Sequence, residues 1–361
     1  MLSHKRICLV IPSLNPGGME RVMSELANYF CKDQNIEVHL LLYGRKHEVF
    51  FTLNKKIIIH KPNFTFKNRL RLLYTIKTIL FLRNQIKNID AFAYLSFGER
   101  WNNLVLLSSM GLKKKIIVSD RVAPGKKYKF PYMILRKWLY PKANKIIVQT
   151  SKAKEIVAKQ LNASNIIVIG NPIRKFPHEN PLLKENVVLS VGRLITTKHH
   201  DDLIRIFVNI KKSGWKLVIV GDDAQKQNNK NKLKELIKSL DAEDIVELVG
   251  FTKNVDYQYQ KSKIFAFTSS SEGFPNVIGE ALSAGLPVVA YNCVAGPSDL
   301  IKNGENGYLI EQFNQTIFSQ QLFNLMENEE LRIKLSNNAC NSIQHFNSET
   351  ICQLYLKELI S

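Results

Sequence analysis

The sequence predicts an α/β protein made of two Rossmann-like domains, each with a parallel sheet. Short runs rich in Val, Ile and Leu alternate along the chain with amphipathic helical patterns, which is typical of βαβ units. The 361 residues, 45% of them hydrophobic, are enough for two separate cores. Residues 171–181 hold three prolines and separate these runs into two sets. We therefore expect two domains that face a central cleft.

The strands are expected at the apolar runs on either side of the proline-rich segment. The runs before it are residues 7–11, 57–59, 91–95, 115–118 and 146–148. Those after it are residues 187–190, 217–220, 246–249, 263–268 and 286–290. These boundaries predict a first domain over residues 1–172, a linker over residues 173–186 and a second domain over residues 187–342.

The most informative motif follows the apolar run 263–268. Glu272 and Glu280 lie eight positions apart around a predicted helix start. Pro275 suits the first helical position, where its missing N–H costs nothing, and Gly273 lets the backbone approach a ligand closely. Helix N-termini at the carboxyl ends of parallel strands attract phosphate. The backbone amides expected to face the ligand are those of Phe274, Asn276 and Val277.

The segment from Ser270 to Ala281, Ser-Ser-Glu-Gly-Phe-Pro-Asn-Val-Ile-Gly-Glu-Ala, resembles the signature of the retaining GT-B glycosyltransferases of family 4. Three further segments resemble that family in the same order along the chain. They are residues 7–21 with Gly17 and Gly18, residues 191–198 with Arg193 and Lys198, and residues 296–310. The resemblance implies the GT-B fold, a nucleotide-sugar donor, and a last segment, residues 343–361, that returns to the first domain as a helix.

The resemblance also implies roles for individual residues. Glu272 is expected to help position the donor sugar, and Glu280 to contact the ribose. Arg193 and Lys198 correspond to the basic pair that holds the donor diphosphate. Gly17 and Gly18 open a helix whose amides are expected to reach the donor phosphates, with a tight turn into an amphipathic helix as the alternative.

Fixed cations are one way to stabilise the charge that develops on a departing nucleoside diphosphate. Arg offers a rigid bidentate fork and Lys a mobile point charge. The alternative is a metal ion held by paired aspartates, but the pairs Asp201-Asp202 and Asp222-Asp223 are adjacent, so their side chains diverge. We therefore expect no metal and no other cofactor. Without the glutamate motif, Arg193 and Lys198 would be read as solvated loop cations.

Asp120 and Arg121 end the predicted strand 115–118, where many members of the family carry a histidine at the position of Arg121. An arginine cannot act as a base near neutral pH. An acid–base role for that position therefore does not transfer to this chain. The pair is read either as a site of acceptor or phosphate recognition or as a structural ion pair.

The net positive charge is concentrated in the first half of the chain. Residues 1–170 contain 30 Lys and Arg against 9 Asp and Glu, whereas residues 171–361 contain 21 against 22. Residues 69–89 interleave basic and apolar side chains. Together with the basic residues 113–115, 126–127 and 136–137 they would form a surface suited to an anionic membrane, with an inward-packed helix as the alternative for residues 69–89. No helix-turn-helix, zinc or RNA-binding signature accompanies this charge, so nucleic acid is not an expected partner.

Localisation follows from what is missing from the sequence. No apolar run reaches the ~18–20 residues of a membrane span, and no signal-peptide pattern is present. The five cysteines are scattered, which indicates reduced thiols. We therefore expect a cytoplasmic protein that attaches peripherally to the membrane.

Together these features predict a retaining glycosyltransferase for surface polysaccharides. It would move a sugar from a nucleoside-diphosphate sugar, with UDP favoured over GDP, to a lipid-linked or membrane-borne glycan. The alternatives are a nucleotide-sugar epimerase, a glycosyltransferase with a soluble acceptor and, last, a basic nucleic-acid-binding protein. The sequence leaves open the donor sugar, the acceptor, the linkage and the oligomeric state.

Overall fold

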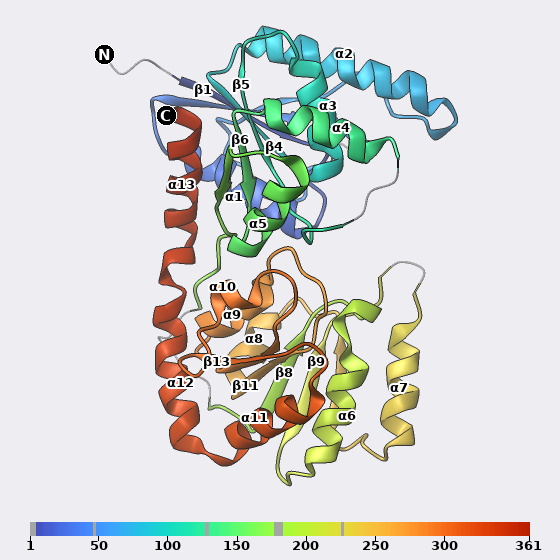
Figure 1. Ribbon diagram of the computed structural model, residues 1–361, viewed down its shortest axis with the longest axis vertical. Coiled ribbons are helices and arrows are strands. Elements are labelled where there is room, and N and C mark those ends of the chain that lie inside the picture. The colour runs from blue at the N-terminus through green and yellow to red at the C-terminus, as the bar shows by residue number, and fades with distance from the viewer. Residues whose placement is uncertain (1–4, 46–47, 127–129, 177–182, 225–226) are drawn as a thin grey trace. The chain divides into compact units, whose positions relative to one another are not determined.

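The computed structural model describes residues 5–45, 48–126, 130–176, 183–224 and 227–361, which form two compact units (Figure 1). The first unit comprises Met1–Pro172 and Ser348–Ser361, and the second comprises Ile173–Asn347. Of the linker expected at residues 173–186, residues 177–182 lie outside the described part of the chain. Ile173 and Phe176, at its start, are buried in a core cluster of the second unit.

The first unit is built on a parallel sheet. Its order across the described residues is β3-β2-β1-β4-β5-β6-β7. The strands are β1 (Lys5–Ile11), β2 (Ile36–Leu42), β3 (Ile58–His60), β4 (Ala93–Phe97), β5 (Lys115–Ser119), β6 (Lys145–Val148) and β7 (Ile166–Val168). The helices are α1 (Gly18–Phe30), α2 (Arg71–Ile89), α3 (Glu99–Ser109), α4 (Tyr132–Leu139), α5 (Ser151–Leu161) and α13 (Ser348–Ile360).

The second unit has its own parallel sheet. Its order across the described residues is β10-β9-β8-β11-β12-β13. The strands are β8 (Val187–Val191), β9 (Lys216–Val220), β10 (Val246–Gly250), β11 (Ile264–Phe267), β12 (Val288–Tyr291) and β13 (Gly307–Ile310). The helices are α6 (His200–Ile210), α7 (Asn229–Ser239), α8 (Val255–Lys261), α9 (Asn276–Ser283), α10 (Pro297–Leu300), α11 (Gln315–Glu327) and α12 (Glu329–Ser342).

The prediction of two parallel sheets is confirmed. Both sheets are covered by helices on their two faces, so their central strands read as continuous apolar runs instead of alternating ones. In β11 all four residues are buried. In the first unit, α13 packs against α1 and β4 and so completes the cover on one face of that sheet (Figure 1).

The strand order locates the functional edge of each sheet. In a doubly wound sheet, ligands bind at the carboxyl ends of the strands where the strand order reverses. The reversal falls between β1 and β4 in the first unit and between β8 and β11 in the second. The loops that follow these four strands are therefore the places where binding side chains are expected.

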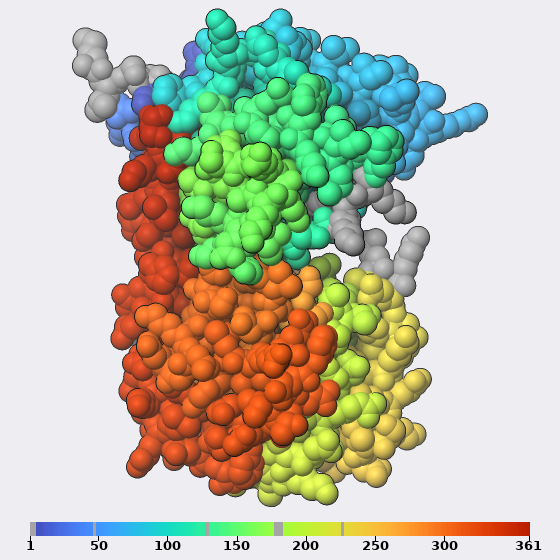
Figure 2. All heavy atoms as spheres, viewed as in Figure 1, coloured from blue at the N-terminus to red at the C-terminus, as the bar shows by residue number. Residues whose placement is uncertain are grey.

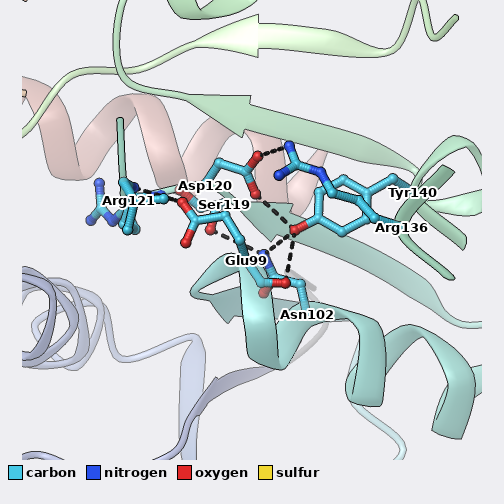
Figure 3. A network of polar contacts seen from close by, with 8 residues as sticks. Glu99, Asn102, Ser119, Asp120, Arg121, Arg136 and Tyr140 are labelled. Atoms are coloured by element: carbon cyan, nitrogen blue, oxygen red, sulfur yellow. Dashed lines mark hydrogen bonds and ion pairs between the residues drawn. The ribbon is translucent and has the colours of Figure 1, made fainter. Parts of the chain in front are cut away.

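A buried polar network supports the carboxyl ends of β4 and β5 (Figure 3). The Asp120 carboxylate forms an ion pair with Arg136 of α4 and accepts a hydrogen bond from the Tyr140 hydroxyl at 2.8 Å. Asn102 of α3 donates to the main-chain oxygen of Ser119 and to the Tyr140 hydroxyl, both at 3.1 Å. The network fixes α3 and α4 against the end of β5.

Glu99, the first residue of α3, belongs to the same network. One of its carboxylate oxygens accepts hydrogen bonds from the amides of Arg121 and Val122, the latter at 2.6 Å. The side chain is buried, and this burial, with the nearby Asp120 carboxylate, raises the pKa of Glu99 to about 7. Its carboxyl group therefore shapes the turn after β5 and changes its charge near neutral pH.

This raised pKa predicts a pH-dependent stability. The folded state binds the Glu99 proton more tightly than the unfolded chain does, so the stabilising effect is complete below about pH 4.5 and is lost as the pH rises through about 7. In the wild type, the free energy of unfolding should therefore fall by an amount on the order of 2 kcal/mol over this pH range. In Glu99→Gln, where the amide oxygen still accepts both N–H groups, we expect this fall to be absent. Urea unfolding between pH 5 and 8, followed by tryptophan fluorescence, measures it. The exposed Glu48→Gln is the control, and equal pH dependence in wild type and Glu99→Gln would contradict the assignment.

Candidate active site

The loops after β8 and β11 meet in an ion pair between two residues that the sequence selected independently. The Lys198 ammonium lies 2.6 Å from a carboxylate oxygen of Glu272, and their side chains are only 15% and 14% exposed. Lys198 ends a short 3-10 helix (Thr196–Lys198) that precedes α6, instead of starting α6 itself. The two charges thus neutralise each other at the carboxyl edge of the sheet, 74 residues apart in the chain.

Hydrogen bonds between the two loops hold this ion pair in place. The Thr268 hydroxyl, at the end of β11, donates to the main-chain oxygens of Lys198 and His199 at 2.9 and 3.0 Å. The amide of Ser270 donates to the main-chain oxygen of Thr197 at 2.8 Å. The Lys198 ammonium also lies over the ring of Phe267, 5.1 Å from its centroid. The side chains of the pair therefore emerge from a fixed backbone.

His199 and His200 were not selected from the sequence. A ring nitrogen of His199 lies 2.9 Å from the Ser270 hydroxyl oxygen, which adds a side-chain contact between the two loops. Burial, followed by the charge of Lys198, lowers the pKa of His200 to about 4. Its imidazole is therefore neutral at physiological pH and does not add a second positive charge beside Lys198.

Arg193 lies on the loop directly after β8. Its side chain is exposed, and no described residue pairs with its guanidinium. Gly221, at the end of β9, makes room for this loop: it has a φ of +149°, and a Cβ there would lie 1.9 Å from the main-chain oxygen of Gly192. The Leu194 amide then donates to the Asp222 main-chain oxygen at 3.0 Å. Arg193 is thus an exposed cation on a constrained backbone, unpaired within the described part of the chain.

The start of α9 differs in three details from the sequence-based expectation. The helix begins at Asn276, and Pro275 is its N-cap, whose carbonyl accepts the Ile278 amide at 2.9 Å. The Asn276 amide is not free, because it donates to the Phe274 main-chain oxygen at 3.0 Å. The Phe274 ring is buried against Phe346, so only its backbone can face a ligand.

Gly273 and Val277 are half-buried at this helix start. A second segment packs tightly against it: Gly296 has a φ of +105°, and a Cβ there would lie 2.1 Å from Cδ of Pro275. Only glycine fits both that backbone conformation and that approach. The segment before α10 therefore supports the N-terminus of α9.

Glu280 lies on α9 and is held by residues that the sequence did not indicate. Its carboxylate accepts a hydrogen bond from the buried Tyr259 hydroxyl at 3.1 Å and lies 3.5 Å from Nε of Arg174. Arg174 also pairs with Asp256 of α8 at 2.5 Å. Burial, then the Glu280 charge, raises the pKa of Tyr259 well above its ordinary value, so the phenol remains a donor. These contacts orient the Glu280 carboxylate.

In the first unit, Gly17 and Gly18 follow β1 and are exposed at the N-terminus of α1. The helix starts at Gly18, and the Arg21 amide donates to the Gly17 main-chain oxygen at 2.9 Å. Gly17 is extended, with a φ of −179°, so the glycine is not required there by backbone strain.

Asp120 and Arg121 have separate surroundings, as Figure 3 shows. The ion-pair partner of Asp120 is Arg136, not Arg121, and both members of that pair are buried. The Arg121 guanidinium stacks on Phe97, 3.9 Å from the ring centroid, and one nitrogen donates to Oδ1 of Asn171 at 2.7 Å. Its Nε and Nη2 groups are buried without a hydrogen-bond partner among the described residues. Asp120 is therefore engaged, whereas Arg121 retains donors for an anion.

Within the described ranges, no group of three or more His, Cys, Asp or Glu residues has the geometry of a metal site. The adjacent pair after β9 is engaged in the protein. Asp222 lies 3.4 Å from the Lys230 ammonium, and Asp223 accepts the Asn229 amide at 2.9 Å. The part of the chain that the structure describes also has no helix long and apolar enough to span a membrane.

Comparisons with known proteins match both units. The family described as "Glycosyltransferase Family 4" matches residues 16–174, and "Glycosyl transferases group 1" matches residues 173–342. The amylovoran biosynthesis glycosyltransferase AmsD of Erwinia amylovora is 30% identical over 96% of this chain and 97% of its own length. An N-acetylgalactosamine-N,N'-diacetylbacillosaminyl-diphospho-undecaprenol 4-alpha-N-acetylgalactosaminyltransferase of Campylobacter jejuni is 30% identical over 99% of this chain and 100% of its own.

Solved structures of similar fold cover nearly the whole chain. TarM has a TM-score of 0.79 at 16% sequence identity, with 99% of each chain covered. Anabaena HepE in complex with UDP has a TM-score of 0.78 at 19% identity, with 98% of this chain and 99% of that chain covered. The two parallel sheets are therefore those of a GT-B fold. With the family matches and the full-length relatives at 30% identity, they show that the chain belongs to glycosyltransferase family 4, a family of retaining glycosyltransferases.

Proposed function

We propose that this glycosyltransferase transfers a sugar from a UDP-sugar to a lipid-linked glycan in the synthesis of a bacterial surface polysaccharide. The Lys198–Glu272 ion pair at the carboxyl edge of the second sheet carries the proposal. The names of the relatives support the acceptor class, because the Campylobacter enzyme acts on a diphospho-undecaprenol-linked sugar. The UDP in the HepE structure supports the choice of nucleotide.

The donor diphosphate would exchange partners with the ion pair. Its oxygens carry more negative charge than one carboxylate and can accept charge-assisted hydrogen bonds from Lys198. Arg193, exposed on the loop that follows β8, can add a bidentate contact. Glu272 would then be released to accept hydrogen bonds from the donor sugar's hydroxyls. Glu280, already oriented by Tyr259 and Arg174, would accept from the ribose.

Transfer requires stabilisation of the charge that develops on the departing diphosphate. Arg193, Lys198 and the amides of Gly273 and Val277 at the start of α9 are the groups proposed for it. In the proposed front-face route the acceptor's hydroxyl oxygen attacks the anomeric carbon of the sugar from the face that the diphosphate leaves. The departing phosphate oxygen accepts the proton of that hydroxyl group. The new glycosidic bond therefore keeps the anomeric configuration without an enzyme nucleophile.

Gly17, Gly18 and Arg121 are the groups of the first unit proposed to contact substrates. They lie at the ends of β1 and β5, on the carboxyl edge of that sheet. The unpaired Arg121 nitrogens suit a phosphate or a sugar hydroxyl. Asp120 is proposed to act indirectly, by holding the turn that carries Arg121, because its carboxylate is engaged with Arg136 and Tyr140.

The membrane is the proposed partner of the first unit, at the cytoplasmic face. Leu72 is 77% exposed, Leu80 is 55% exposed, and both lie on α2 near the exposed Arg71 and Lys77 (Figure 2, light blue). Two other cations that the sequence analysis assigned to this basic surface make contacts within the protein instead. Arg83 donates to the main-chain oxygen of Met110 at 2.8 Å, and Arg136 is buried in its ion pair.

The first prediction concerns metal-free binding. UDP should bind in the presence of a chelator, because fixed cations carry the contacts, and Arg193→Ala or Lys198→Ala should each weaken binding about tenfold. Calorimetry with UDP, and with GDP as the second choice, measures this. Lys216→Ala, at the opposite edge of the same sheet, is the control. Binding that requires added magnesium would overturn the fixed-cation account.

The second prediction concerns turnover. Glu272→Ala and Lys198→Ala should each lower the rate by orders of magnitude, because a preorganised electrostatic contact in a transition state is worth about 3 to 4 kcal/mol. Each single variant leaves one charge unpaired in a mostly buried position, so the double variant should recover thermal stability without recovering activity. Glu247→Ala, exposed on β10, is the control. A near-normal rate in either single variant, measured with donor and acceptor, would remove that residue from the site.

The third prediction concerns membrane attachment. The protein should float with anionic but not neutral liposomes, since each Lys or Arg near an anionic surface contributes about 1 kcal/mol. Attachment should weaken at high salt and when Arg69, Arg71, Lys77 and Lys87 are changed to Gln. The matched control changes Lys55, Lys56, Lys154 and Lys159, which are exposed outside α2. Equal recovery with both liposome types, or none with either, would instead favour a soluble acceptor.

A further inference from the structure

The first unit has a large pocket at the amino edge of its own sheet, the edge opposite the loops that follow β1 and β4. The pocket has a volume of about 730 Å³ and lies between the end of α3 and the first residues of β5. Its lining includes four lysines, Lys113, Lys114, Lys115 and Lys142, together with Ser109 and Asn144. Because Lys115 is the first residue of β5, the pocket is at the amino ends of the strands, away from the loops that follow β1 and β4.

The positive charge in this pocket is only partly neutralised within the described residues. Lys114 forms an ion pair with Asp90. The Lys115 ammonium donates to the main-chain oxygen of Leu359 at 3.1 Å and to an oxygen of Ser361, the last residue described and itself part of the pocket lining, at 2.7 Å. The Lys142 ammonium lies over the ring of Trp138, 5.3 Å from its centroid.

Lys113 has no ion-pair partner among the described residues, and its side chain is exposed. Its φ of +47° lies in the left-handed region, where glycine would cost less than any L-residue with a side chain. The lysine at this position therefore places a free ammonium at the pocket at some conformational cost.

Further lysines, Lys145 and Lys5, lie near Lys115 and add to the positive charge around the pocket. Burial lowers the pKa of Lys115, and the neighbouring Lys145 and Lys5 lower it further, while Glu358 raises it. A bound anion would relieve this repulsion. Asn144 adds a neutral donor: its Oδ1 accepts the Ile116 amide at 2.7 Å, and no described residue accepts from its NH2 group.

Apolar side chains lie beside the lysines. Trp138, whose ring carries the Lys142 ammonium, is 48% exposed on α4, and Ile134 is exposed one turn earlier on the same helix. Met110 lines the pocket and is also exposed. A tryptophan and aliphatic groups next to ammonium groups suit the boundary between lipid headgroups and acyl chains. A freely diffusing phosphate would gain nothing from them.

We infer that this pocket binds the phosphate of an anionic glycerophospholipid headgroup, with Lys113 and Lys142 as its principal cationic contacts and Trp138 beside the glycerol end of the lipid. Lysine suits this role because it is a point charge with three donors, which a phosphate accepts in several orientations. The inference rests on the proposed attachment of the first unit to a membrane. It adds to that attachment a site that recognises phosphate, instead of negative charge in general.

The test compares two kinds of vesicle at equal zeta potential. Both are phosphatidylcholine, and the negative charge comes from phosphatidylglycerol in one and from oleate in the other. The wild-type protein should prefer phosphatidylglycerol about fivefold, the effect expected of one lysine–phosphate contact. Lys113→Gln/Lys142→Gln should lose this preference. Lys77→Gln/Lys87→Gln removes the same charge from α2 and should lower binding to both vesicles while keeping the preference.

The remaining outcomes are decisive in either direction. Equal binding of wild type to both vesicles, or an unchanged preference in Lys113→Gln/Lys142→Gln, would overturn the inference. Calorimetry with glycerol 1-phosphate separates the two sources of phosphate: tight binding in solution with no vesicle preference would assign the pocket to a soluble phosphate and reject the lipid. UDP binding in the same variant reports separately on the donor site, so failure of the proposed function and failure of this inference are distinguishable.

Discussion

The ion pair between Lys198 and Glu272 is the interaction on which the rest of the candidate site depends. Both side chains are mostly shielded from water, so an unpaired charge in either place would be costly. The pair satisfies both charges within the protein and holds both groups in a fixed geometry. In the proposed reaction, a diphosphate that takes over Lys198 would meet a preorganised cation, and Glu272 would be freed at the same moment for a neutral partner, the sugar. Little reorganisation would then remain for the step in which charge develops.

The topology of the sheet makes this ion pair possible. Strands β8 and β11 are neighbours in the sheet, although the 72 residues between them, 192–263, also form β9, β10 and their helices. Because both strands run in the same direction, their following loops leave the sheet at one edge. The Thr268 hydroxyl then donates to the main-chain oxygens of Lys198 and His199, which fixes the loop after β8 against the end of β11.

The sequence indicates features that are encoded locally. Most of the strands, though not β2, β7 and β13, were expected from short apolar runs. The glutamates near the start of α9 and the two cations after β8 each lie within one short segment, so residue type and the resemblance to the family were enough to select them as candidates. Contacts between distant segments were not predictable in this way. Arg174 meets Glu280 from 106 positions away, and Glu99 binds the amides of Arg121 and Val122 from the end of another strand. Such partners depend on strand order and loop geometry, which carry no periodic signal.

The same limit explains why Asp120 and the basic surface needed correction. An aspartate next to an arginine looks like a pair, but successive residues after a strand point in different directions, and Arg136 reaches Asp120 from α4 instead. Counting charges likewise could not separate Arg83 and Arg136, which hold the fold together, from Lys77 and Lys87, which are exposed.

What distinguishes a membrane surface from a merely basic one is the apolar component. A solvated cationic face would expose lysines and keep its leucines inside. On α2, Leu82 and Ile86 already anchor the helix to the core, yet Leu72 and Leu80 remain exposed on the same helix as the free cations. Electrostatic attraction falls off over a Debye length, whereas buried apolar area does not depend on salt. A face with both components can be drawn to an anionic surface by its charges and retained there by its leucines.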